Sequence, residues 1–183
     1  MLTVDEPVVI HENGEDDIRI LARPDFSDPF VAHLEAMRFG TSGLRYRRLG
    51  VRQQLERLPA SVFLELYRGS SMAGTYVISQ APLEASAGAP HGVYRGLLTV
   101  RPDARGAGLG RRLVRQAFDW IEARARQTDR PVVSWGCIER ENLRSLRVLE
   151  SMGAQRIGVL ESLTAYRQWP RETLKIEQLD GSW

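Results

Sequence analysis

The stretch that decides the fold is Leu97-Leu-Thr-Val-Arg-Pro-Asp-Ala-Arg-Gly-Ala-Gly-Leu-Gly-Arg-Arg-Leu113. Its first four residues are apolar or β-branched and predict the end of a strand, which Pro102 terminates. A glycine-rich turn follows over residues 105–110. From Leu109 the apolar residues recur at helical spacing, which predicts an amphipathic helix to about residue 127. The stretch is therefore a strand–turn–helix unit.

The turn is suited to binding an anion. Glycines at positions 106, 108 and 110 let successive backbone N–H groups converge without a Cβ atom in the way. The start of the helix adds unpaired N–H donors and a partial positive charge. Three side chains add full positive charge nearby: Arg105, Arg111 and Arg112. A phosphate or pyrophosphate is the expected guest.

The residue count excludes two familiar nucleotide-binding loops. A P-loop requires Lys and then Ser or Thr after its last glycine, whereas this chain has Arg111 and Arg112. A dinucleotide-binding turn that begins at Gly106 requires glycine at position 111, and one that begins at Gly108 requires it at Leu113. Neither requirement is met.

What remains resembles the acetyl-CoA loop of GNAT-type N-acetyltransferases, Gln/Arg-x-x-Gly-x-Gly/Ala. This chain supplies Arg105, Gly108 and Gly110 at those positions, and the preceding Val100-Arg101-Pro102 matches the family's strand end. The resemblance implies an α/β fold whose mixed, mostly antiparallel sheet has a central splayed pair of parallel strands and flanking helices. It also implies acetyl-CoA as the cosubstrate.

Composition sets the outer bounds. The chain has 183 residues and a net charge of +2, and this small charge does not favour nucleic acid or a membrane as a partner. Cys137 is the single cysteine, which fits a reducing cytoplasm. The three histidines show no paired-ligand spacing, so we expect no metal site. The segment 1–17 is polar and is expected to be loose or a frayed strand; 18–183 form one domain.

The remaining elements follow from periodicity and turn residues. Residues 61–67 and 74–79 flank a turn and predict an antiparallel hairpin. The strand at 131–138 follows the strand–turn–helix unit and is expected to run parallel to 91–100. Further strands are expected at 18–23, 155–166 and 171–179, and further helices at 30–37, 51–58 and 142–152.

The helix at 142–152 carries a second part of the resemblance. The family pattern has Asn, then Ala or Ser, and often a Tyr on this helix; here the positions hold Asn142, Ser145 and Leu149. Asn142 is expected either to cap the helix or to face the cofactor. Ser145 could reach the pantetheine arm or the phosphates, or be an ordinary helix residue. Leu149 departs from the family, because leucine cannot protonate a departing thiolate.

The resemblance further implies direct attack of an amine on the acetyl thioester. Acetyl-CoA is expected to enter between the two splayed strands, with backbone N–H groups near Leu98 and Val100 bonding the pantetheine or polarising the carbonyl. The full set of expected cofactor-binding residues is Leu98, Thr99, Val100, Arg105, Gly106, Ala107, Gly108, Leu109, Gly110, Arg111, Asn142 and Ser145.

The general base is not singled out by the sequence. Glu65, in mid-strand, and Glu139, just past a strand end, are candidates, and each could instead be a solvated or salt-bridged carboxylate. Cys137 suggests a covalent route as an alternative. Its position in an apolar strand is instead typical of a cysteine that is buried for packing. The basic loop 38–48 could shape the acceptor site or could be a solvated surface.

Two functions of different classes follow from these patterns. The first is an acetyl-CoA-dependent N-acetyltransferase that acts on a primary amine of a small molecule or a protein. The alternative is a module of the same fold that binds or senses acyl-CoA without turnover, which the departure at Leu149 keeps open. Transfer of a longer acyl group is a third interpretation. Pairing through the C-terminal strands could give a homodimer.

Overall fold

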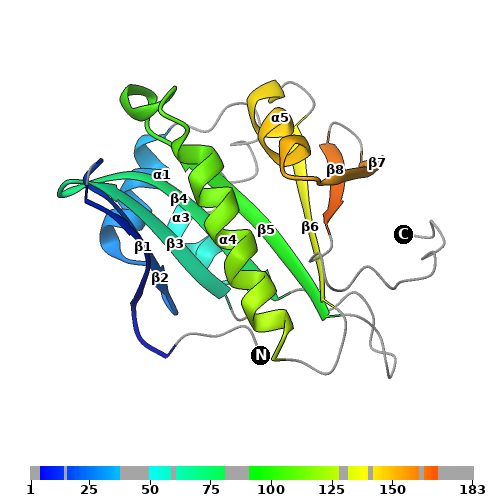
Figure 1. Ribbon diagram of the computed structural model, residues 1–183, viewed down its shortest axis with the longest axis horizontal. Coiled ribbons are helices and arrows are strands. Elements are labelled where there is room, and N and C mark those ends of the chain that lie inside the picture. The colour runs from blue at the N-terminus through cyan, green and yellow to red at the C-terminus, as the bar shows by residue number, and fades with distance from the viewer. Residues whose placement is uncertain are drawn as a thin grey trace.

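A mixed sheet forms the centre of the molecule, with helices on both of its faces (Figure 1). The computed structural model describes residues 5–14, 16–37, 50–58, 61–80, 91–127, 132–139, 142–160 and 163–168. Within them, the sheet has eight strands in the order β1-β2-β3-β4-β5-β6-β8-β7. The strands are β1 Val8–Asn13, β2 Ile18–Arg23, β3 Ser61–Arg68, β4 Ser71–Gln80, β5 His91–Val100, β6 Val132–Glu139, β7 Gln155–Leu160 and β8 Leu163–Gln168.

The strand directions confirm the fold that the sequence predicts. Strands β5 and β6 run parallel, and every other neighbouring pair is antiparallel. The parallel pair requires a crossover, and the helix α4 (Leu109–Ala125) supplies it. The expected hairpin is β3–β4, which pairs from Ser61↔Ser79 to Arg68↔Ser71.

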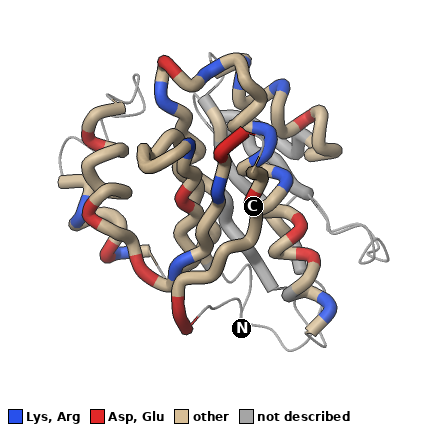
Figure 2. The backbone as a smooth tube through the Cα atoms, turned by 60° about the vertical axis from the view of Figure 1, so that its left-hand side comes forward, with Lys and Arg blue, Asp and Glu red and all other residues tan. Residues whose placement is uncertain are grey.

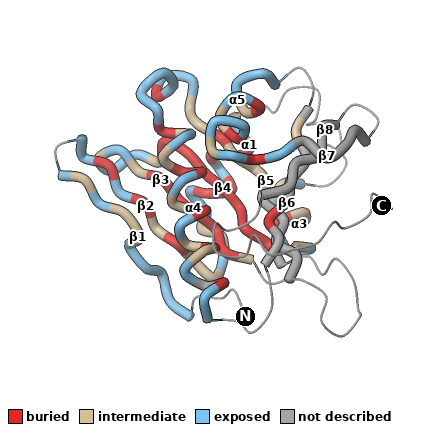
Figure 3. The backbone as a smooth tube through the Cα atoms, turned by 45° about the vertical axis from the view of Figure 1, so that its right-hand side comes forward, coloured by how far each residue is buried: buried red, intermediate tan, exposed pale blue. Residues whose placement is uncertain are grey.

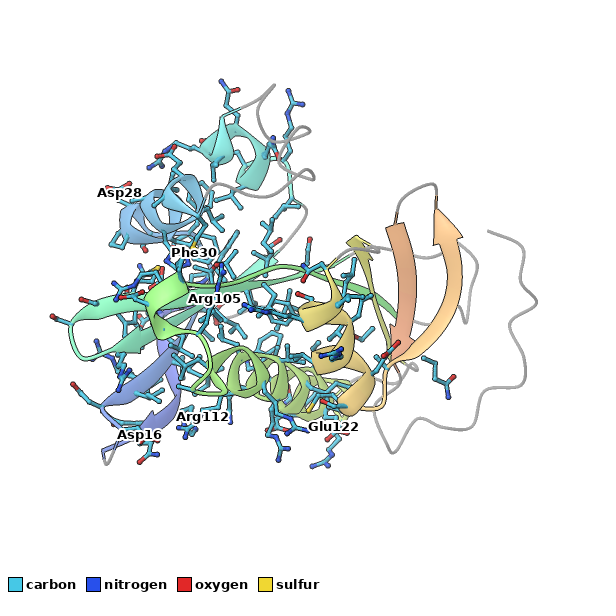
Figure 4. All side chains as sticks on the ribbon, turned by 90° about the horizontal axis from the view of Figure 1, so that it is seen from above. Asp16, Asp28, Phe30, Arg105, Arg112 and Glu122 are labelled. Atoms are coloured by element: carbon cyan, nitrogen blue, oxygen red, sulfur yellow. The ribbon has the colours of Figure 1, made fainter. Side chains whose placement is uncertain are left out.

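Helices cover the two faces of the sheet in an unequal way. Figure 4 shows α4 on one face, and α1 (Asp28–Ala36) and the short α3 (Val51–Leu55) on the other. Helix α5 (Leu143–Ser151) contacts α4 and lies on its side of the sheet. The larger core lies between the sheet and α4; a smaller one lies under α1 and α3. We refer to these as the α4 face and the α1 face.

The alternation of side chains along the central strands creates both cores at once. On β3, Val62, Leu64 and Leu66 pack toward α4, whereas Phe63 packs against Phe30 of α1 with the ring centroids 5.4 Å apart. Figure 3 shows buried residues along the middle strands and exposed or half-buried ones along β1, an edge strand.

The structure decides one open alternative and corrects two element boundaries. The segment 1–17, expected to be loose or a frayed strand, contains β1, which pairs with β2 and in which three of the six residues are exposed and three are half-buried. Residues 155–166, expected as one strand, belong to two antiparallel strands, β7 and β8. Helix α4 ends at Ala125 rather than near residue 127. The expected strand at 171–179 and the basic loop 38–48 lie outside the described residues.

The distribution of charge and the hydropathy of the helices complete the description of the fold. Acidic and basic residues are interspersed over the described backbone (Figure 2), as the small net charge implies. No helix in the described part of the chain combines the length and the apolar character needed to cross a membrane.

Candidate active site

The site begins where β5 and β6 separate. The two strands pair only from His91↔Val132 to Tyr94↔Trp135. Beyond these four pairs β5 continues alongside β4 to Val100, and β6 continues alongside β8 to Glu139. The last residues of β5 therefore present to β6 a backbone edge that the β5–β6 ladder does not use. This is the splayed parallel pair that the sequence analysis expects.

An irregularity in β5 lies beside this edge. The β4–β5 register shifts between Thr75↔Thr99 and Val77↔Gly96, so Leu97 and Leu98 together face one residue of β4. Leu97 has a φ of 54°, in the left-handed region that a branched side chain rarely adopts. Such a conformation costs about 1–3 kcal/mol and persists only where surrounding contacts impose it.

Successive residues of a strand direct their backbone N–H and C=O groups to opposite sides, and this alternation gives the direction of these groups at the edge of β5. The Arg101 N–H donates to the Ala73 carbonyl on β4 at 2.8 Å, so residue 101 bonds toward β4. The neighbouring Val100 must then point its backbone away from β4. Its carbonyl accepts a bond from Arg105 Nε at 3.0 Å, which agrees with that direction. By the same alternation, Leu98 and Val100 direct their N–H groups toward the side of β6.

The glycine turn follows directly, after the short helical turn Pro102–Ala104. Gly106 has a φ of 90° and Gly108 a φ of 73°, and a Cβ added to either would meet nothing within 4 Å. Glycine is required there by the backbone conformation, and the space in front of the turn is open. The first bond of α4 joins Arg112 N–H to the Gly108 carbonyl at 3.0 Å. The N–H groups of residues 109–111 consequently have no carbonyl partner within the helix.

The three arginines near the turn do not share one role. Arg112 Nη2 donates to Asp16 Oδ2 at 2.7 Å, which ties the first turn of α4 to the β1–β2 connection. Figure 4 shows Arg112 and Asp16 together, apart from Arg105. Arg105 and Arg111 are exposed at the turn. All three are expected to supply charge for the anion, whereas Arg112 forms an ion pair with Asp16.

These features fit the acetyl-CoA molecule that the sequence analysis expects. The positive-φ glycines, the open space in front of the turn and the N–H groups at the start of α4 would suit a pyrophosphate. The unpaired edge at Leu98 and Val100 lies one short connection away along the chain. When bound, acetyl-CoA would supply an activated acetyl thioester; residues 105–111 would hold its phosphates.

Asn142 has the capping role that is one of its two expected roles. Asn142 is the N-cap, and its Oδ1 accepts the Ser145 N–H at 3.2 Å. Ser145 is half-buried at the first turn. Leu149 is buried, with 5% of its surface exposed, in the core between the sheet and α4. The position where the family often has tyrosine is therefore a packing position in this chain.

Glu65 is held inside the protein by three neighbours. Its side chain is fully buried, accepts bonds from Ser27 Oγ and from Tyr67 Oη, the latter at 3.0 Å, and lies 3.8 Å from Arg23 Nε. Burial and the adjacent Glu65 carboxylate raise the pKa of Tyr67 to about 12. Ser27 is also the N-cap of α1. The carboxylate thus fastens α1 to the sheet, a role that competes with catalysis. The side chain of Glu139 lies outside the described residues.

Thr99 differs from its neighbours in the expected site. Its side chain lies on the α1 face, 6% exposed, and its Oγ1 is 2.6 Å from Thr75 Oγ1 and 2.8 Å from His33 Nε2. Leu98 and Val100 pack toward the α4 face. Thr99 therefore takes part in a buried polar network beneath the unpaired edge.

Sequence reasoning missed His33 and Thr75 as parts of this network. Burial, and then the positive charge of Arg101, lower the pKa of His33 to about 4, so the imidazole is neutral at pH 7. A signal was present: His33 stands three residues after Phe30 on the apolar side of α1, and Thr75 lies two residues before Val77, on the same face of β4. Both patterns place a polar group on a buried face.

Comparison with known proteins agrees with this geometry. The model of the acetyltransferase (GNAT) family matches residues 19–154. No curated protein matches the sequence.

Among solved structures, a GNAT-family protein from Desulfovibrio desulfuricans superposes with a TM-score of 0.60 at 16% identity, covering 84% of this chain and 99% of that one. A mutant of the toxin AtaT, bound to the C-terminus of the antitoxin AtaR and acetyl-CoA, gives 0.60 at 19% identity over 86% and 96%. The yncA protein of Salmonella typhimurium with its cofactor acetyl-CoA gives 0.50 at 20% identity over 86% and 96%.

The family match spans the strand–turn–helix unit and both strands of the splayed pair. It ends just after the helix that carries Asn142 and Leu149. The chain therefore belongs to the GNAT family of acetyltransferases.

Proposed function

We propose that this acetyltransferase transfers an acetyl group from acetyl-CoA to a primary amine by direct attack on the thioester. The observation that carries the proposal is the separation of β5 from β6 beyond Tyr94 and Trp135, next to the open glycine turn. It leaves the N–H groups of Leu98 and Val100 directed away from β4, where they can bond the thioester carbonyl or the pantetheine amides.

Backbone donors suit this chemistry because negative charge develops on the carbonyl oxygen as the amine attacks. Donors fixed in a strand need little reorganisation at the moment of reaction, and a single such donor is typically worth about 10²–10³ in rate. The register shift at Leu97 supports the proposal, because it changes the local direction of β5 at the point where such donors are needed.

Departure of CoA does not require a side-chain acid. A thiol has a pKa of about 8.5, so its expulsion as thiolate at pH 7 is uphill by only about 2 kcal/mol. Leu149 occupies the position where the family often has a tyrosine and is buried in the core. We propose that the thiolate leaves unprotonated or takes its proton from water.

The attacking amine must be neutral. A free primary amine has a pKa of about 10.4, so only about one molecule in 2,500 is neutral at pH 7 and a base accelerates the reaction. Glu65 is fully buried and bonded to Ser27 and Tyr67. Of the two candidates, Glu139 at the end of β6 is the one that we retain as the base.

Steady release of CoA in the presence of amines tests the proposal. Small amines, polyamines, amino acids and peptides with free N-termini or lysines form the panel, with acetyl-CoA at saturation. Turnover with at least one amine, above the rate of acetyl-CoA hydrolysis, is the expected result. Binding of acetyl-CoA without turnover on any acceptor would contradict it.

The second function, an acyl-CoA-binding or sensing module, rests on one specific observation. The leucine at position 149 is fully integrated into the core between the sheet and α4. A module that holds acyl-CoA without transfer has no need of an acid there. The same panel distinguishes the two functions, because a sensing module binds acetyl-CoA tightly and releases no CoA.

A further inference from the structure

A row of buried polar side chains crosses the sheet beneath α1. The strand registers pair Glu65 with Thr75 and Thr75 with Thr99 across β3, β4 and β5. All three are buried, with at most 6% of their surface exposed. Helix α1 bonds to both ends of the row, through Ser27 to Glu65 and through His33 to Thr99. We call Glu65, Thr75 and Thr99 the polar row.

The two short contacts at the β5 end allow either direction of donation, and the contact of Thr75 with the Leu97 carbonyl, which can only accept, selects one of them. Thr75 Oγ1 donates to the Leu97 carbonyl at 3.4 Å. Its remaining contact with Thr99 Oγ1, at 2.6 Å, must then be one in which Thr99 donates. Thr99 has no second proton, so the 2.8 Å contact with His33 requires the imidazole to donate from Nε2. The chain therefore starts at an imidazole N–H and ends on the Leu97 carbonyl.

The peptide at the end of this chain matters for the site. A trans peptide directs its C=O and N–H in opposite directions, and the structure has no cis peptide among its described residues. When Thr75 holds the Leu97 carbonyl toward β4, the N–H of Leu98 is directed away from β4, toward the side of β6. Leu97 has a left-handed φ, a conformation that persists only where surrounding contacts impose it, and the Thr75 hydroxyl is one such contact.

We infer that Thr75, Thr99 and His33 are positioning residues, which hold the Leu97–Leu98 peptide so that the Leu98 N–H meets the acetyl carbonyl. This inference rests on the proposed acetyl transfer. It assigns a catalytic consequence to a network that is buried between the sheet and α1. It also gives α1 a function, because the imidazole that begins the hydrogen-bond chain belongs to that helix.

The decisive variant is Thr75→Val, which removes the hydroxyl and keeps the shape of the side chain. We expect kcat to fall about 10-fold or more, because misplacement of a reacting group by 1 Å can cost about 100-fold. The KM for acetyl-CoA should stay unchanged, because the glycine turn binds the phosphates independently. Thr75→Ser restores the hydroxyl and should recover most of kcat.

The matched control is Ser79→Ala. Ser79 lies on the same strand, four residues farther along, and its side chain is 2% exposed. Its loss should lower the melting temperature and leave kcat unchanged. A merely structural role for Thr75 predicts equal effects of the two variants on kcat, and that result would overturn the inference.

A second pair of variants tests the start of the chain. His33→Gln keeps an N–H donor on a side chain of similar reach, whereas His33→Leu removes it. We expect His33→Leu to lower kcat with little change in KM, and His33→Gln to retain more of the activity. Equal activity of the two variants would contradict a role for the hydrogen bond between His33 and Thr99 in positioning the peptide.

The amide proton resonance of Leu98 separates this inference from the proposed function. Acetyl-CoA should shift this resonance in the wild-type protein, and Thr75→Val should weaken the shift while Ser79→Ala preserves it. If acetyl-CoA binds and no amine is acetylated, the proposed transfer fails, but these shifts still support the positioning. If acetyl-CoA binds and leaves the Leu98 resonance unchanged in the wild type, the positioning is overturned.

Discussion

The two faces of the sheet are built in different ways. On the α4 face, apolar residues from the central strands and from α4 form one continuous core, which includes Leu109 and Leu113. On the α1 face, a smaller apolar cluster around Phe30 and Phe63 lies beside the polar row. The face that carries the anion site is stabilised by burial, and the opposite face combines burial with directed hydrogen bonds.

This difference indicates which face of the sheet supports cofactor binding and which supports acetyl transfer. Apolar packing has no direction, so it can anchor the turn and the start of α4 without specifying one peptide orientation. Hydrogen bonds have direction, so the α1 face can determine which way the Leu97 carbonyl points. Binding of acetyl-CoA should therefore depend on the α4 face, and efficient transfer on the α1 face.

The largest effect on stability should come from Glu65→Ala on the α1 face. It removes the acceptor of Ser27 and Tyr67 and leaves Arg23 without its buried partner. Removal of one partner of a buried ion pair typically costs about 3–5 kcal/mol. Urea unfolding measures this loss.

The variant Glu65→Gln serves as the matched control, because it keeps the size and one oxygen acceptor. It also tests the sequence-based hypothesis that Glu65 is the base. We expect its kcat to depend on pH as in the wild type. Loss of the acidic limb of that profile, along which activity rises with pH, would show that Glu65 is the base.

On the α4 face, Leu113→Ala should destabilise by about 2–5 kcal/mol, because it opens a cavity in the core. Leu113 is fully buried and its Cδ1 lies 3.0 Å from where a Cβ on Gly74 would be. Leu143→Ala is the control, since Leu143 is 57% exposed, and should change stability by less than about 0.5 kcal/mol. Similar losses in the two variants would contradict the assignment of the core.

His33 should make the α1 face sensitive to acid. Its pKa of about 4 in the folded protein lies below the unfolded value of 6.5, so the unfolded chain binds more protons between these pH values. The free energy of unfolding should therefore rise with pH from about 4 to 6.5, by about 1–3 kcal/mol from this group. The rise should be smaller in His33→Gln, measured by urea unfolding at pH 4.5 and pH 7. An identical pH dependence in both proteins would show that His33 titrates normally.

The smallest effect is expected from Arg112→Ala. Its ion pair with Asp16 joins side chains that are 36% and 49% exposed, and such pairs contribute about 0–1 kcal/mol. The affinity for acetyl-CoA should hardly change, whereas Arg105→Ala or Arg111→Ala should weaken it. Calorimetric titration compares the three, and a dominant loss in Arg112→Ala would show that this arginine faces the ligand.

The sequence predicted the α4 face well, because its signals are local. Glycine spacing and the helical periodicity from Leu109 define the turn and the helix without reference to distant residues. The parallel direction of β5 and β6 followed from the crossover. For the segment of β1 the sequence left two alternatives open, a loose segment or a frayed strand, because a half-exposed edge strand carries little hydrophobic alternation.

The polar row could not be predicted from the sequence, for a different physical reason. Glu65, Thr75 and Thr99 become neighbours only through the registers of three strands, and a shift of one residue would send each to the other face. His33 reaches Thr99 across 66 positions of the chain. The periodicity of α1 indicated that His33 is buried, but not which hydroxyl it meets.

The most direct test of the account is the thermal stabilisation that acetyl-CoA gives to the wild-type protein and to Gly108→Glu. At about 100 times its dissociation constant, a ligand stabilises by about 2.7 kcal/mol. Gly108 has a φ of 73°, so a glutamate there strains the turn and adds a negative charge to the anion site. The account predicts a clear rise in melting temperature for the wild type with acetyl-CoA, none with ATP, and none for the folded variant with acetyl-CoA. An equal rise in wild type and variant, or no rise in either, would contradict it.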